Sequence, residues 1–210
     1  MAEIKIGRMT MGMCQTNCYF LYREGCSEVM LFDPPTAGRQ IYDKLKEKGF
    51  EVKMILLTHA HFDHIMGCNE LIEASGAKLY AFCEEQLLCE NPKVNLSTSF
   101  HQPYTVKPDV YLKEGDTVTM GDVSCKVIAT PGHTKGSCCF YFEEAGFLVA
   151  GDTLFLESVG RSDFPTGSAG ELIRSIKEKL FVLPDNTKVY PGHGDSTTIE
   201  HEKKYNPFCV

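Results

Sequence analysis

The sequence predicts an α/β protein in which helices flank the sheets. Apolar runs with the length of buried strands recur along the chain, and the clearest cover 52–57, 138–142 and 147–150. An amphipathic helix is indicated by apolar residues at helical spacing, namely Leu172, Ile173, Ile176 and Leu180. With 210 residues, of which 43% are hydrophobic, the chain can form one sizeable core, so we expect a single domain over 1–210.

The first half of the chain begins with β-rich runs over 4–7, 18–23 and 29–32. A helix follows, which we expect Thr36 to cap and Gly49 to end, with Ile41 and Leu45 on its buried face. The strand over 52–57 then leads into a cluster of histidines. A second helical stretch is expected to begin at Leu71.

The second half reads as strands followed by a helix and a final strand. Residues 118–129 predict a hairpin around Gly121 and Asp122. The strands over 138–142 and 147–150 come next, and the helix over 172–180 precedes a strand over 188–190.

The segment Thr58-His59-Ala60-His61-Phe62-Asp63-His64 places three imidazoles and a carboxylate close together. His59 and His61 are two residues apart, so they share a face of an extended segment but not of a helix. This spacing excludes the helical H-E-x-x-H zinc motif. Asp63 and His64 are adjacent, so we expect their side chains to diverge and to serve a different ion from the first pair.

Three further candidate ligands, His133, Asp152 and His193, share one local pattern. In each case an apolar run leads to a glycine that directly precedes the ligand. Glycine lets the backbone turn sharply, and side chains at the ends of strands are held rigidly. Seven potential ligands can bind two divalent ions and still leave positions for water or substrate. We therefore expect a metallohydrolase with two divalent ions, zinc in the first place, with iron and manganese as alternatives.

Net charge and composition restrict the kinds of binding partner that we expect for this protein. A net charge of −7 disfavours nucleic acid and anionic membranes, so we expect a small-molecule substrate, and the sequence leaves monomer and homo-oligomer open. No apolar run could span a bilayer, and Glu3, Lys5 and Arg8 lie where a signal peptide would be apolar, which favours a cytoplasmic protein. The ten cysteines form no C-x-x-C pair, which favours reduced thiols, with a functional role open for Cys14 and Cys18.

The segment 58–64 has the form T-H-x-H-x-D-H, and together with the later ligands the whole chain resembles the metallo-β-lactamase superfamily. The resemblance implies a four-layer αβ/βα sandwich with the metals at one edge, between two sheets. It implies one ion held by His59, His61 and His133 and another held by Asp63, His64 and His193, with Asp152 bridging them. Asp63 and Asp152 are the implied catalytic carboxylates, and Asp33, in a strand-end D-P motif, is the implied partner that orients a ligand.

Within the superfamily, the stretches over 160–164 and 191–194 are similar to short enzymes of the glyoxalase II group, which hydrolyse thioesters of the S-lactoylglutathione type. Longer members carry a C-terminal helical domain that binds glutathione, and we expect none here because the chain ends at Val210. The thiol therefore stays open between glutathione, bacillithiol, coenzyme A and another small thiol. Metal-bound hydroxide, available near neutral pH, would attack the thioester, and a thiolate with a pKa of about 8.5 leaves without a strong acid.

Arg161 is expected to bind a substrate carboxylate and Phe164 to form a wall, the alternative being an ion pair with Asp163 and a packed ring. The R-x-D-F stretch also resembles persulfide dioxygenases of the same superfamily, which use one iron held by two histidines and an aspartate. A lactonase or another hydrolase of the superfamily is a further alternative, because the fold does not fix the substrate.

Overall fold

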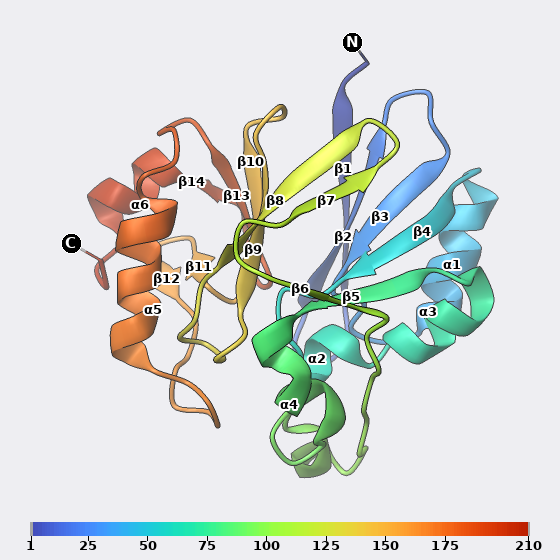
Figure 1. Ribbon diagram of the computed structural model, residues 1–210, viewed down its shortest axis with the longest axis horizontal. Coiled ribbons are helices and arrows are strands. Elements are labelled where there is room, and N and C mark those ends of the chain that lie inside the picture. The colour runs from blue at the N-terminus through green and yellow to red at the C-terminus, as the bar shows by residue number, and fades with distance from the viewer. Residues whose placement is uncertain (1, 210) are drawn as a thin grey trace.

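Two six-stranded sheets pack face to face in the computed structural model, which describes residues 2–209 (Figure 1). The first sheet contains, in order across it, β1 (Ile4–Met11), β2 (Thr16–Arg23), β3 (Glu28–Phe32), β4 (Glu51–Leu56), β5 (Lys78–Phe82) and β6 (Val110–Leu112). The second contains β14 (Thr197–Thr198), β13 (Lys188–Pro191), β10 (Phe147–Gly151), β9 (Cys138–Phe142), β8 (Val123–Ala129) and β7 (Thr117–Met120).

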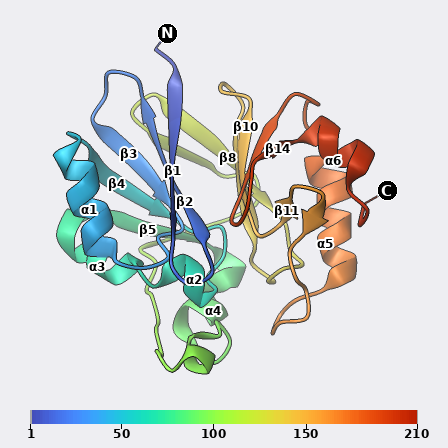
Figure 2. The same ribbon diagram turned by 180° about the vertical axis from the view of Figure 1, so that it is seen from behind.

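Helices cover the outer face of each sheet (Figures 1 and 2). Those on the first sheet are α1 (Gly38–Glu47) and α3 (Cys68–Ser75), and those on the second are α5 (Ala169–Ser175), continued by a π-helical turn over Ile176–Leu180, and α6 (Ile199–Tyr205). The short helices α2 (Phe62–Ile65) and α4 (Gln86–Glu90) and a 3-10 turn at Ser97–Phe100 lie at one end of the sandwich, at the bottom of Figure 1. The small hairpin of β11 (Leu154–Phe155) and β12 (Ser158–Val159) lies between the second sheet and α5. The expected four-layer αβ/βα sandwich is therefore confirmed.

The core has three layers of buried side chains, one between the sheets and one under the helices of each face. Between the sheets, the ring of Phe32 meets that of Phe140 edge to face, with centroids 5.3 Å apart. Ile41 and Leu45 of α1 are buried against the first sheet, as their spacing predicted. β9 and β10 are buried along their whole length because they lie in the middle of the second sheet.

Element boundaries differ from the sequence predictions at several points. Thr36 does not cap α1: the N-cap is Ala37, in the left-handed conformation with φ of 48° and no side-chain cap bond. The turn before it is fixed instead by the backbone, since Gly67 N donates to Pro34 O at 2.9 Å. The helix α3 begins at Cys68 rather than Leu71, and the helix expected over 172–180 begins at Ala169 and ends in the π-helical turn.

The hairpin expected over 118–129 is formed by β7 and β8. The sequence predictions did not include the strands β5, β6, β11, β12 and β14 or the helices α2, α4 and α6. Within residues 2–209, no helix combines the length and the apolar character needed to cross a bilayer.

Candidate metal centre

The seven candidate ligands meet at one edge of the sandwich, from four separate stretches of the chain. His59 and His61 follow β4, whereas Asp63 and His64 lie in the single turn of α2. The other three follow β8, β10 and β13, and these are His133, Asp152 and His193. Rigid strands therefore deliver most of the cluster, and little freedom is lost when its members converge.

Three imidazoles form a first group, made of His59, His61 and His133. His61 Nδ1 lies 2.9 Å from His133 Nε2, and His133 Nε2 lies 3.1 Å from His59 Nε2. All three rings are buried. Ring nitrogens this close can share hydrogen bonds only in part, whereas one cation at their centre would accept all three lone pairs.

Asp63, His64 and His193 form a second group. His193 Nε2 lies 3.3 Å from Asp63 Oδ2, and His64 Nε2 lies 3.4 Å from His193 Nε2. The expected divergence of Asp63 and His64 is wrong: the turn of α2 brings His64 Nε2 within 3.8 Å of Asp63 Oδ2. The two neighbours converge on one group, which shares no member with the triad of histidines but lies next to it, since His59, His64 and Asp152 form a further candidate group.

Asp152 lies between the two groups. Its Oδ2 is 3.6 Å from His133 Nε2 in the first and 3.4 Å from His193 Nε2 in the second, and its Oδ1 is 3.4 Å from His64 Nε2. Asp152 Oδ1 is buried and has no hydrogen-bond partner among the described residues. A buried carboxylate oxygen without a partner, next to imidazole nitrogens, fits a site built for metal ions.

The protein's own groups fix the orientation of several rings. His133 Nδ1 lies 2.6 Å from Arg161 O, and His193 Nδ1 lies 3.0 Å from Cys14 O. Asp33 is buried, accepts from Thr58 N and Thr58 Oγ1 at 2.8 and 2.7 Å, and places Oδ2 3.2 Å from His64 Nδ1. Such contacts direct the other ring nitrogen toward a metal.

The glycines that precede the ligands are required by close packing. A Cβ at Gly192 would overlap Asp152 Oδ1 and lie 2.8 Å from His64 Cε1. Gly151 has φ of 49°, and a Cβ there would overlap the side chain of Thr58. The glycine pattern in the sequence therefore reflects how closely the ligand turns approach one another.

Comparison with known proteins identifies the family. Residues 11–193 match the family model described as the metallo-beta-lactamase superfamily.

The chain belongs to the metallo-beta-lactamase superfamily.

Two named relatives are similar in sequence to this protein over nearly its whole length. It is 37% identical to the probable metallo-hydrolase YqgX of Bacillus subtilis, over 98% of this chain and 97% of the relative. It is 30% identical to the hydroxyacylglutathione hydrolase GloC of Haemophilus influenzae, over 92% of each. These likenesses identify a metal-dependent hydrolase.

Solved structures of the superfamily have the same architecture. The BLEG-1 B3 metallo-beta-lactamase aligns with a TM-score of 0.93 and 35% identity, over 98% of this chain and 100% of that one. TTHA1623, in a di-iron-bound form, aligns with a TM-score of 0.83 and 33% identity, over 96% and 99%. ETHE1 from Myxococcus xanthus aligns with a TM-score of 0.80 and 28% identity, over 97% and 83%.

The histidines of the candidate metal centre differ in their pKa values and therefore in their charge at neutral pH. Burial and neighbouring imidazoles hold the pKa of His59 well below its ordinary value and lower the pKa of His61 to about 3. Burial opposes a charge on His64 too, but Asp152 and Asp63 outweigh it and raise the pKa of His64 to about 9. The same carboxylates outweigh burial at His193 and raise its pKa to about 11.

Burial opposes the charge of Asp63 and Asp152, but His64 and His193 together outweigh it and hold both pKa values below their ordinary range. Without metal at neutral pH, His64 and His193 therefore carry protons opposite two carboxylates, while His59 and His61 are neutral. The group of His59, His61 and His133 can therefore bind a cation without losing protons. In the second group, His64 and His193 must each lose a proton before they can coordinate a metal.

We expect zinc binding to the metal-free protein near pH 7.5 to release between about two and three protons per chain, two from the coordinating nitrogens of His64 and His193 and the rest from water that the bound ions ionise. The affinity for metal should fall as the pH is lowered. Calorimetric titrations in two buffers with different ionisation enthalpies measure this number. Histidines with ordinary pKa values near 6.5 would release almost none.

A cavity of about 560 Å³ opens onto the ligands. Both residues predicted to bind substrate line it, and they contact each other: Arg161 Cζ lies 4.1 Å from the centroid of the Phe164 ring. Arg161 also forms an ion pair with Asp163, with Nη2 and Oδ2 2.7 Å apart. The structure thus contains the Arg161–Asp163 ion pair that the sequence analysis gave as the alternative to substrate binding. Arg161 nevertheless lines the cavity.

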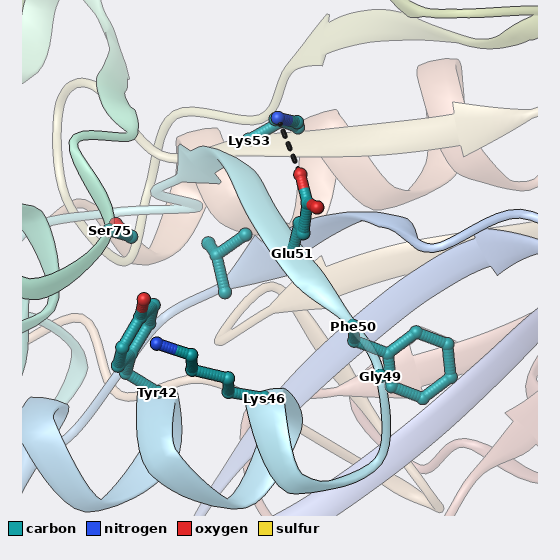
Figure 3. Close-up of a pocket in the computed structure, with 8 residues that line it drawn as sticks. Tyr42, Lys46, Gly49, Phe50, Glu51, Lys53 and Ser75 are labelled. Atoms are coloured by element: carbon teal, nitrogen blue, oxygen red, sulfur yellow. Dashed lines mark ion pairs between the residues drawn. The ribbon is translucent and has the colours of Figure 1, made fainter.

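A second hollow, of about 450 Å³, lies between α1 and β4, away from the ligands (Figure 3). Its charged groups are already partnered, since Lys53 Nζ lies 2.8 Å from Glu51 Oε2 and Lys46 Nζ lies 5.4 Å from the centroid of the Tyr42 ring. None of the candidate metal-binding groups among the described residues borders it. We therefore place the chemistry in the cavity above the histidines.

Sequence reasoning missed a buried carboxylate behind the ligands. Glu85 is fully buried, and its Oε1 accepts from Ala60 N at 2.8 Å and from Thr134 Oγ1 at 3.0 Å. Ala60 lies between His59 and His61, and Thr134 follows His133, so one side chain joins both ligand turns of the first group. The sequence carries no local signal for this role, because Glu84 and Glu85 form an ordinary acidic pair.

Proposed function

We propose that this protein hydrolyses small-molecule thioesters of the S-lactoylglutathione type, with two divalent ions bound by the seven ligands. One observation carries the proposal: two ligand groups, with Asp152 between them, border a cavity whose described lining residues include no suitable acid for a poor leaving group. The printed name of the GloC relative supports the same reaction.

The titratable groups around the cavity favour a thioester over an amide. Besides the ligands, they are Cys14 and Arg161. Burial and the neighbouring Asp63 raise the pKa of the Cys14 thiol to about 11, so it is a weak acid at neutral pH and is not ionised as a nucleophile. Arg161 does not release its proton. A thiolate with a pKa of about 8.5 can leave without such an acid, whereas an amine cannot.

Two bound ions would lower the pKa of water and polarise the thioester carbonyl. The side chains of the protein would hold the two ions and orient the water and the substrate. Asp152 would keep both groups in register, and Thr16 Oγ1, which donates to Asp63 Oδ2 at 3.1 Å, fixes the Asp63 carboxylate where it can orient a water hydrogen. We propose that Arg161 and Phe164, at the rim, contact the substrate.

Oxidation of a thiol persulfide at a single iron is the second candidate, and the likeness to ETHE1 favours it. That chemistry requires two histidines and an aspartate, whereas five histidines and two aspartates converge here. The larger donor set is the reason why we place hydrolysis first.

A turnover panel with metal analysis separates these reactions. We expect the metal-loaded protein to hydrolyse S-lactoylglutathione or another small thioester faster than lactones, lactams or nitrophenyl phosphodiesters, with two ions per chain. A single iron per chain with rapid oxygen uptake on glutathione persulfide, and no thioester turnover, would reject the hydrolase.

A further inference from the structure

Apolar side chains form most of the cavity wall beyond the ligands. They come from α2, the 3-10 turn, the small hairpin and the loop after it, and they are Phe62, Leu96, Phe100, Phe155, Val159 and Phe164. The rings of Phe62 and Phe100 stack with centroids 4.1 Å apart. Phe100 nevertheless remains 42% exposed, so part of its apolar surface faces the cavity without a protein partner.

The segment that carries Leu96 and Phe100 is firmly anchored. Asn95 is fully buried, and its Nδ2 donates to Leu88 O at 3.0 Å and to Tyr104 O at 2.9 Å. Its Oδ1 accepts from Ser97 N at 3.0 Å. The backbone of Asn95 also accepts from Phe62 N at 2.9 Å, which ties the segment to the ligand turn. The apolar wall is therefore set in place before a substrate arrives.

Leu96 adopts a backbone conformation that is costly for its side chain. Its φ is 72°, in the left-handed region where glycine or asparagine is the usual residue. Strain of this kind persists where the surrounding structure enforces it, and it clusters at binding sites. The strained backbone holds an apolar side chain on the cavity.

The positive charge of Arg161 on the cavity wall is already neutralised by an ion pair with Asp163. Arg161 is the cationic side chain among the described residues that line the cavity, apart from histidines. Its Nε and Nη2 lie 2.9 and 2.7 Å from the two carboxylate oxygens of Asp163. An anionic substrate arm would have to compete with this pair, whereas an apolar arm would find the surfaces of Leu96 and Phe100 open.

We propose that the cavity selects thioesters with an apolar alkyl or aryl arm, and that Leu96 and Phe100 determine this specificity. The inference rests on the proposed thioester hydrolysis and names its substrate class. The apolar arm can belong to the acyl group or to the thiol, because either side of the thioester can lie along the wall.

Two substrate series test the proposal on the metal-loaded full chain. The first varies the acyl group on N-acetylcysteamine from acetyl and lactoyl to hexanoyl and phenylacetyl. The second keeps an acetyl group and varies the thiol from glutathione to hexanethiol. We expect kcat/KM to rise by about tenfold or more toward the apolar end of at least one series, and the series that responds identifies the arm.

Leu96→Gly and Phe100→Ala should each reduce that preference by about fivefold or more. Glycine suits the backbone of residue 96, so Leu96→Gly removes the side chain without added strain. Leu87→Ala is the matched control, because Leu87 is an exposed apolar residue outside the cavity, and it should keep the wild-type preference. S-hexyl-N-acetylcysteamine, a thioether that cannot be hydrolysed, should bind the wild type more tightly than its S-methyl counterpart.

Equal kcat/KM across both series, or a preference that survives both substitutions, would overturn the proposal while leaving thioester hydrolysis standing. Failure to hydrolyse any member of either series would instead overturn the proposed function.

Discussion

Asp152→Ala is expected to reduce thioester turnover by more than about a hundredfold and to lower the bound metal below two ions per chain. Loss of a residue that merely orients a ligand costs about 10- to 100-fold, and Asp152 faces ligands of both groups directly. Metal analysis of purified protein and steady-state kinetics measure the two effects.

Two further variants show whether the effect of Asp152→Ala comes from the lost charge, from the lost side-chain volume or from general destabilisation of the protein. Asp152→Asn keeps the size of the side chain but removes its charge, so it should lose most of the activity as well. Asp43→Ala removes an exposed carboxylate of α1, paired with Arg39 at 3.2 Å, and should leave metal content and turnover unchanged. If Asp152→Ala kept full turnover with two ions, the shared-ligand assignment would be wrong.

Glu85→Ala is expected to destabilise the protein and to weaken metal binding although Glu85 touches no ligand. It would leave Ala60 N buried without its acceptor, at a cost of about 1–3 kcal/mol, and Thr134 Oγ1 would keep only its contact with Ser137 Oγ at 2.7 Å. For a chain of this size, a loss of about 3 kcal/mol lowers the melting temperature by roughly 6–12 °C. The two ligand turns would also lose their common anchor, so we expect about 10- to 100-fold weaker metal binding.

Glu85→Gln keeps one acceptor oxygen and should fall between the wild type and Glu85→Ala in both measurements. Glu84→Gln is the matched control, because Glu84 is the adjacent glutamate and pairs with Lys135 at the surface at 2.5 Å. Thermal melts of the metal-free protein and chelator competition for metal separate stability from affinity. Wild-type metal affinity in Glu85→Ala would contradict the positioning role.

The seven candidate ligands, which the structure brings together, could be selected from the sequence because each carries a local signal. The segment 58–64 is dense in histidine, and the glycines before Asp152 and His193 mark turns that the structure needs for close packing. The strands β1–β4, β7–β10 and β13 could be predicted from their apolar runs, and α1 from Ile41 and Leu45, which repeat at helical spacing and face the first sheet.

The parts that escaped prediction depend on contacts between distant segments. Glu84 and Glu85 are alike in sequence, yet one is paired at the surface and the other is buried between two ligand turns. Leu96 and Phe100 lie in a short 3-10 region without periodicity, and their place on the cavity follows from Asn95 and its partners. Thr36 is a good capping residue by type, but α1 begins after Ala37, and the segment before the helix is held by a hydrogen bond from the distant Gly67 N to Pro34 O.

Titration of the metal-free protein with zinc tests the central claim most directly, because it counts ions and displaced protons in one experiment. The geometry of the seven candidate ligands, the raised pKa values of His64 and His193 and the ionisation of metal-bound water predict two ions and between about two and three protons per chain near pH 7.5. Uptake of a single ion, or of two ions without proton release, would contradict the account.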